Sequence, residues 1–275
     1  MTVIAMTREM GTLGKDVAIG LIDTLGLDVV HHELVERHLA ERMNLGESAV
    51  HRFLEGSPSM LERWKIDGKR LSRYSAEEIL ERATQGNVLI RGWGAAQLLS
   101  EVQHVICIRI CAPMKNRVAQ MKQRLEIEDD AAVQREIRQN DDAHTRAIQR
   151  QFGQDWRSPY SYDIVLNTAR VPIDACVRQI RLLADCPEYQ ETDASRATLQ
   201  RKLTEARVRT VVDTEWSDTP FGSGITVTVA DGTVTLRGVT AGLSGARSVI
   251  EKIRSIEGVE DVKNEVLVAR HGYGV

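Results

Sequence analysis

The sequence is poor in aromatic residues and contains no long apolar run. Aromatic side chains make up 4% of the 275 residues, and the four tryptophans are too scattered for a stacking platform that would bind nucleic acid. No apolar run approaches the roughly 18–20 residues that span a bilayer, so no transmembrane segment is expected. The opening residues lack the basic start and the cleavage site of an export signal, which predicts a cytoplasmic protein.

The sequence also has little excess charge and little cysteine. Thirty-six Lys and Arg residues stand against 39 Asp and Glu, so the net charge is -3 and no global positive field would hold DNA or anionic lipid. The four cysteines form no C-x-x-C pair, which favours free thiols over a disulfide or a zinc site. Any site that binds an anion must therefore be local.

The chain alternates short apolar runs with helical periodicity over its first two thirds. Five runs of strand length are expected, and each is followed by a helical pattern: 3–6, 27–30, 88–90, 105–110 and 163–166. Ser75 and Glu78 match a capping box, which predicts a helix from there to Gly86. This alternation indicates a three-layer α/β domain with a parallel sheet.

The last third has a different pattern. A proline-containing stretch without apolar periodicity predicts a linker over residues 186–198, between a domain at 1–185 and a module at 199–270. Residues 225–229 alternate strictly, and Asp231-Gly232 is typical of a tight hairpin. A helix, two strands, a second helix and a final strand are expected there, which makes the module α+β with the order α-β-β-α-β.

The loop between the first strand and the first helix carries the chemistry. Its sequence is Arg8-Glu9-Met10-Gly11-Thr12-Leu13-Gly14-Lys15-Asp16. At such a junction the backbone N–H groups and the helix N-terminus favour phosphate, glycines allow close approach, and a lysine neutralises charge. The Walker pattern fails twice, because Glu9 occupies its first glycine position and Asp16 stands where a hydroxyl residue would bind Mg²⁺.

Five segments in order resemble motifs of the cytidylate-kinase-like family of P-loop kinases. The phosphate loop is similar to that family's S-R-E-x-G-S-G-G, and the later segments resemble its Y-D-R-E-L, A-P-x-x-x-R-V, G-x-D-W and Y-D-x-x-x-N-T motifs. The matching segments are Thr7–Lys15, Val30–Leu34, Ala112–Val118, Gly153–Trp156 and Tyr162–Thr168. The resemblance implies a P-loop kinase fold with a helical lid, and a kinase that uses ATP and Mg²⁺.

The resemblance also implies roles for individual residues. Gly11, Thr12, Leu13, Gly14, Lys15 and Asp16 would bind the nucleotide, with Asp16 holding the metal directly or through water, or else weakening nucleotide binding. Catalytic roles are expected for Lys15, Arg117, Arg146 and Asp142, although the family's acid and arginine before G-x-D-W map onto Asp141, Asp142, His144 and Arg146 without a unique choice. Arg91, Trp93 and Arg138 are the expected substrate-binding residues.

The C-terminal module resembles a BON domain. The match rests on Ile225–Val239 with its Asp-Gly hairpin, on Ala246–Ile253, and on Glu257–Asn264. Such modules are similar to small lipid-binding or interaction domains, so a lipid or protein partner of residues 199–270 is expected, or a role in stabilising or dimerising the protein.

Two functions follow as hypotheses. The first is a kinase that moves the γ-phosphate of ATP to a small nucleotide, with cytidine monophosphate as the first acceptor to test. The second is a nucleotide sensor that binds without turnover and signals through the BON-like module, a hypothesis that Glu9 and Asp16 favour.

Overall fold

The computed structural model describes residues 1–30, 32–54, 68–92, 94–216, 224–240 and 246–268. Its N-terminal body is built on one parallel five-stranded sheet with the order β2-β3-β1-β4-β5. The strands are β1 (Val3–Arg8), β2 (Asp28–Val30), β3 (Val88–Arg91), β4 (Val105–Cys111) and β5 (Ile164–Asn167). The three-layer α/β fold expected from the sequence is confirmed.

Helices cover both faces of this sheet, because the strands are apolar on both sides. One face packs against α1 (Gly14–Leu25) and α9 (Ile173–Asp185), and together they form one apolar cluster. The opposite face packs against α2 (His32–Met43), α3 (Glu47–Leu54), α5 (Gly68–Gln85) and α6 (Ala95–Leu99) in a second cluster.

The helix α5 begins earlier than the sequence suggests. It runs from Gly68, and Ser75 lies within it, where the Ser75 hydroxyl donates to the Leu71 carbonyl. The capping box predicted at Ser75 was therefore wrong. A Ser-x-x-Glu pattern is local, and a serine inside a helix can satisfy its hydroxyl on the preceding turn.

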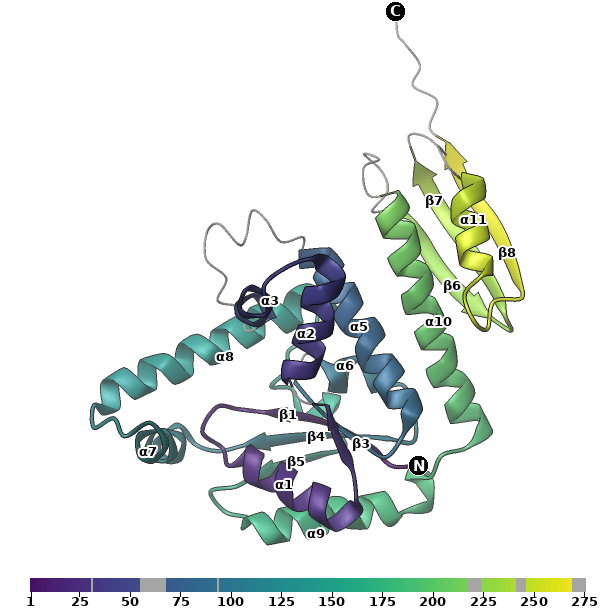
Figure 1. Cartoon of the computed structure of the whole chain (residues 1–275). Coiled ribbons are helices and arrows are strands. Elements are labelled where there is room, and N and C mark those ends of the chain that lie inside the picture. Colours follow the sequence, from purple (N-terminus) through teal and green to yellow (C-terminus); the bar gives the residue numbers. More distant parts are fainter. Residues whose placement is uncertain (31, 55–67, 93, 217–223, 241–245, 269–275) are drawn as a thin grey trace, which may run out of the picture.

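Two further helices project from one side of the body. These are α7 (Met114–Leu125) and α8 (Asp130–Phe152), which pack on each other in a small apolar cluster of their own (Figure 1). Asp129 caps α8, since its carboxylate accepts from the Ala131 and Ala132 amides.

The C-terminal module is a separate three-stranded sheet covered by two helices. The strands β6 (Thr226–Ala230), β7 (Thr233–Thr240) and β8 (Asp261–Val268) lie in that order, with β6 antiparallel and β8 parallel to β7. The helices are α10 (Asp193–Glu215) and α11 (Ala246–Arg254), so the expected α-β-β-α-β order is confirmed.

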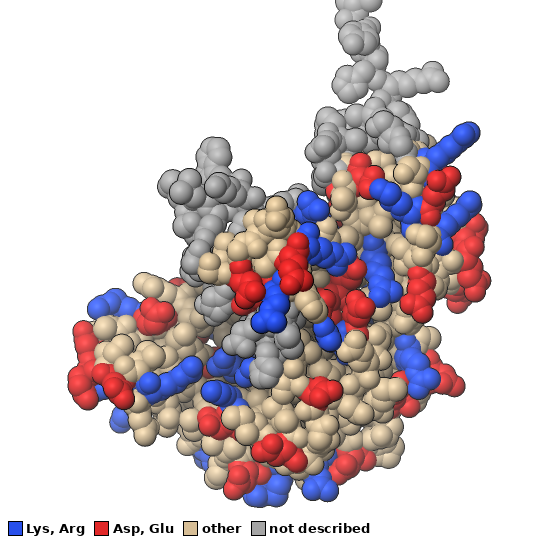
Figure 2. Space-filling model, viewed as in Figure 1, with Lys and Arg blue, Asp and Glu red and all other residues tan. Residues whose placement is uncertain are grey.

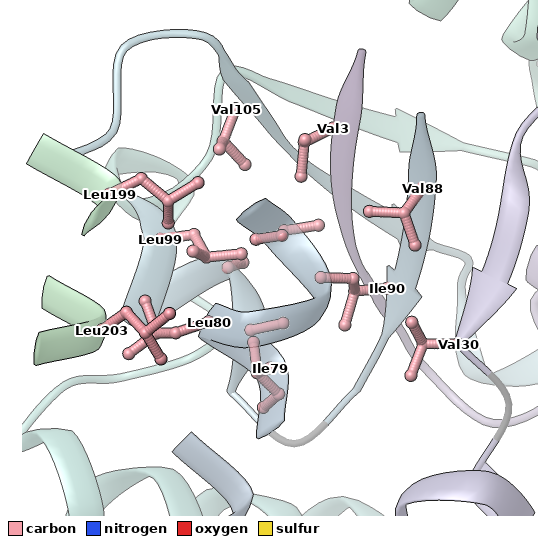
Figure 3. Packing of buried hydrophobic residues seen from close by; sticks show 14 of the residues in the cluster. Val3, Val30, Ile79, Leu80, Val88, Ile90, Leu99, Val105, Leu199 and Leu203 are labelled. Atoms are coloured by element: carbon pink, nitrogen blue, oxygen red, sulfur yellow. The ribbon is translucent and has the colours of Figure 1, made fainter. Parts of the chain in front are cut away.

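The helix α10 belongs to both cores. It lies along α5, and its Leu199 and Leu203 pack into the body beside Leu80 and Leu99 (Figures 1 and 3). Further along the chain Val208, Val212 and Trp216 pack into the module. Residues 193–198, which the sequence analysis placed in the linker, are already helical, and Thr192 and Ser195 form the capping box that starts them.

Candidate functional site

The phosphate loop joins β1, the central strand, to α1 at the carboxyl edge of the sheet. In open α/β sheets ligands bind at this edge, where the strand order reverses. Leu13 precedes α1 in the left-handed conformation, with φ 58°, and its side chain gives the helix no cap. The Leu13 carbonyl accepts from the Asp16 and Val17 amides, so the amides of Gly14 and Lys15 are the ones that could meet an anion, which the helix dipole favours there.

Gly11 is the position where the loop meets helix α7. It has φ +78°, and a Cβ placed there would lie 2.7 Å from the backbone oxygen of Arg117. Any other residue would clash with backbone, which cannot move as a flexible side chain can. The loop is thus shaped by the helix that packs against it.

The Glu9 carboxylate faces into the protein. It accepts from the Arg109 guanidinium at 2.5 Å, and a second guanidinium, that of Arg117, lies 3.5 Å away. The side chain is buried, and the Ala112 amide also donates to it at 3.4 Å. The negative charge that departs from the Walker pattern is therefore compensated inside the fold.

Arg117, for which a catalytic role is expected, lies in a buried network of hydrogen bonds. Its side chain is buried, its Nε donates to the Met10 carbonyl at 2.7 Å, and its two terminal nitrogens donate to Asp141 at 2.8 and 2.7 Å. Asp141 rather than Asp142 is thus the acid held near the loop, whereas Asp142 is exposed on α8. Both acids were alternatives in the sequence analysis.

The other expected site residues lie at the rim. Lys15 and Asp16 are exposed in the first turn of α1, while Arg138 and Arg146 are exposed on α8. Arg91 is partly buried at the end of β3. Trp93 lies outside the described residues. The structure therefore groups the loop with Arg117 and places the remaining arginines on two other elements.

Trp156 is buried beside Arg109 and contacts polar and charged side chains. The Arg109 and Arg157 guanidiniums lie 5.4 and 5.5 Å from its ring centre, and His144 meets it edge-on at 4.5 Å. Its indole N–H donates to Thr145. Burial lowers the pKa of His144 to about 4, so this imidazole is neutral near pH 7.

Sequence reasoning missed Arg109, although a signal was present. It is the charged residue in the otherwise apolar run of β4, near the carboxyl end of the strand. A charge in a strand that is buried on both faces requires a partner, and Glu9 is that partner.

The Y-D-x-x-x-N-T segment supports the loop, since the Thr168 hydroxyl donates to the Thr12 carbonyl at 2.6 Å.

Fold and site together define a class: a P-loop kinase-like nucleotide phosphotransferase fold, with an uncapped helix N-terminus and glycines at the central strand. The comparison with protein families makes this specific. The model of the cytidylate kinase-like family matches residues 3–170, and the chain belongs to that family. The BON domain model matches residues 201–270.

Individual relatives agree with this assignment over the N-terminal body. A cytidylate kinase of Ignicoccus hospitalis is 29% identical over 185 residues, which cover 66% of this chain and 98% of that protein. A cytidylate kinase of Pyrobaculum aerophilum is 25% identical, with coverage of 65% and 90%. A solved structure of an uncharacterized Eubacterium ventriosum protein shares the fold with a TM-score of 0.54, at 18% identity and coverage of 67% and 98%.

No helix among the described residues is long and apolar enough to cross a membrane. They also contain no group of three or more His, Cys, Asp or Glu side chains that could hold a metal ion on their own.

Proposed function

We propose that the protein transfers the γ-phosphate of ATP to a nucleoside monophosphate, with cytidine monophosphate as the first acceptor to test. The observation that carries the proposal is the phosphate loop. Helix α1 begins there without a side-chain cap, and Gly11 of the loop packs against α7. Arg109 and Arg117 pair with Glu9, so this carboxylate would repel a bound triphosphate less than an unpaired acid would. The relatives that are cytidylate kinases support the acceptor class.

The residues present fit a nucleotide tail. The loop amides and Lys15 would hold the β- and γ-phosphates, because backbone dipoles and an exposed ammonium both favour negative charge. Exposed arginines on α8, Arg138 and Arg146 among them, suit bidentate contacts with phosphate oxygens once this helix approaches. Arg91, at the end of β3, would lie on the acceptor side.

The donor set also fits Mg²⁺ bound with the nucleotide. Magnesium usually takes one or two carboxylates together with substrate phosphates and water, and Asp16 offers one exposed carboxylate in the first turn of α1. When bound, the ion would neutralise charge on the terminal phosphates. Asp16 would otherwise repel them, so its role here depends on the metal.

A coupled assay of ADP release tests the proposal. The purified full chain is incubated with ATP, Mg²⁺ and one of CMP, dCMP, UMP or AMP, and turnover is expected with at least one acceptor, CMP first. Lys15→Ala should abolish it, whereas Lys263→Ala, an exposed lysine of the C-terminal module, should leave it unchanged. Turnover that survives Lys15→Ala would contradict the assigned phosphate site.

A second candidate function is nucleotide sensing without turnover. The exposed Asp16 favours it, and so does the physical continuity of α10 through both cores, since a change in the body can reach the C-terminal module along one helix. A non-hydrolysable ATP analogue that binds, with no ADP released for any of the four acceptors, would support sensing. If no nucleotide binds, both functions are excluded.

The module leaves one sheet face uncovered by its helices, and this face carries both signs of charge. Arg237 of β7 pairs with Glu265 of β8 at 2.6 Å. Lys263 and Asp261 also lie on β8. Lys, Arg, Asp and Glu are also interspersed over the side of the molecule seen in Figure 2. Such a balance offers little attraction to anionic lipid, which recruits clusters of basic residues. A protein partner therefore suits this face better than a membrane.

A further inference from the structure

Five charged side chains form a continuous chain beneath the phosphate loop. In order they are Arg109, Glu9, Arg117, Asp141 and Arg157, with consecutive nitrogen-to-oxygen distances of 2.5, 3.5, 2.7 and 3.6 Å. They come from β4, the loop, α7, α8 and the segment after α8. The chain therefore ties the phosphate loop to both projecting helices.

Arg117 is the central member, and each of its three guanidinium nitrogens donates a hydrogen bond. The side chain is 4% exposed, with Nε on the Met10 carbonyl and the two terminal nitrogens on the Asp141 carboxylate. A planar guanidinium that makes three directed bonds has one orientation, unlike a lysine ammonium. Losing one partner of such a buried pair leaves an uncompensated charge, which proteins tolerate poorly.

The bond to Met10 makes this network a constraint on the loop itself. Met10 immediately precedes Gly11, and its side chain packs with the cluster of Val118 and Ile137 between α7 and α8. The backbone of Arg117 is also the wall that Gly11 contacts. Backbone, side chain and apolar packing thus all make the shape of the loop depend on where α7 and α8 lie.

We propose that Arg117 and Asp141 are positioning residues that couple the phosphate loop to helix α8. The coupling is reciprocal, because a contact between α8 and the loop stabilises the position of both. A nucleotide that orders the loop would thereby hold in place the helix that carries Arg138 and Arg146. The inference rests on the proposed function for the nature of the ligand, although the loop constraint itself does not.

The test uses Asp141→Asn, Arg117→Lys and the double variant in the full chain. Glu136→Gln is the matched control, because Glu136 is an exposed carboxylate on the same helix. Adenylyl imidodiphosphate affinity is measured by calorimetry, and kcat and KM by ADP release. Each single variant should weaken analogue binding about tenfold, a mid-range effect for residues in one hydrogen-bond network, and the double variant should weaken it no further.

A clamp on the transferring phosphate would give a different pattern. Arg117→Lys would then lower kcat with unchanged analogue affinity, and Asp141→Asn would leave both near the wild-type values. Losses that multiply to about a hundredfold in the double variant would also overturn the coupling, because independent sites add their free energies. Asp141→Glu, which keeps the charge, should recover part of the affinity.

A second measurement needs no nucleotide and separates the two proposals. Amide hydrogen exchange of the peptide that spans residues 9–15 should be faster in Asp141→Asn than in the wild type, and unchanged in Glu136→Gln. If the wild type binds no ATP analogue while this difference appears, the proposed function fails and the coupling stands. If exchange is unchanged in Asp141→Asn, the coupling is refuted whatever the enzyme does. If Asp141→Asn does not fold, the exchange of the same peptide is measured in Arg117→Lys, which keeps a cation between Glu9 and Asp141.

Discussion

Removing the side chain of Leu203 tests whether α10 is part of the N-terminal body. Leu203 is 3% exposed and packs with Leu80 and Leu99, although it lies in the helix that opens the C-terminal module. A buried leucine cut to alanine costs about 2–5 kcal/mol, so Leu203→Ala should destabilise the body by about 3 kcal/mol. For a body of this size that lowers its melting temperature by about 6–12 °C.

Hydrogen exchange followed by mass spectrometry locates the effect. Peptides from β1, β3 and β4 report the body, and peptides from β6 and β7 report the module. Exchange of the body peptides should accelerate in Leu203→Ala, because global opening limits exchange in core strands. The control is Leu182→Ala, a leucine that is 59% exposed on α9, which should stay within about 0.5 kcal/mol of the wild type.

The result that would refute this reasoning is specific. If Leu203→Ala accelerates exchange only in β6 and β7, then α10 stabilises the module alone and its contacts with α5 contribute little. The domain boundary would then lie before α10, close to where the sequence pattern lapses.

Two further predictions concern the loop and the partly buried His144. Gly11→Ala should reduce affinity for an ATP analogue at least about tenfold, measured by calorimetry, because its Cβ meets the Arg117 carbonyl and φ is positive; unchanged affinity would mean that the loop does not need this shape. Burial lowers the pKa of His144 from 6.5 to about 4, so the unfolded chain takes up this proton at higher pH than the folded protein. The free energy of unfolding should therefore fall between about pH 6.5 and 4, by at most about 3 kcal/mol from this group, and His144→Gln should lose less stability than the wild type in urea titrations across that window. Equal losses of stability in the wild type and His144→Gln would contradict the lowered pKa of His144.

The fold followed from the sequence because its signals are local and strong. Short β-branched runs separated by helical periodicity predicted the parallel sheet, and strict alternation with Asp231-Gly232 predicted the hairpin of β6 and β7. The same locality produced the error at Ser75, since a capping pattern reads identically at a helix start and inside a helix. The start of α10 after Thr192 had a matching signal, but the stretch around Pro187 without apolar periodicity dominated the interpretation.

The place of the phosphate loop was predictable, whereas its electrostatics were not. The glycine pattern between a strand and a helix locates the loop without any tertiary information. The orientation of Glu9 depends on Arg109, one hundred residues further along the chain, and that of Arg117 depends on Asp141 on another helix. Neither partner can be chosen from spacing, because parallel strands and packed helices bring distant residues together.

These partners reverse the sign of the charge beneath the loop. Three guanidiniums and two carboxylates make up the chain from Arg109 to Arg157, so its formal charge is +1 even though it contains Glu9. Because the members are mostly buried, water screens this charge less than it would screen a surface group. Asp16 is exposed in the first turn of α1, and under the proposed function it would take a cation together with the bound phosphate. Nucleotide affinity should accordingly depend on divalent cation more strongly in the wild type than in a variant whose residue 16 is uncharged.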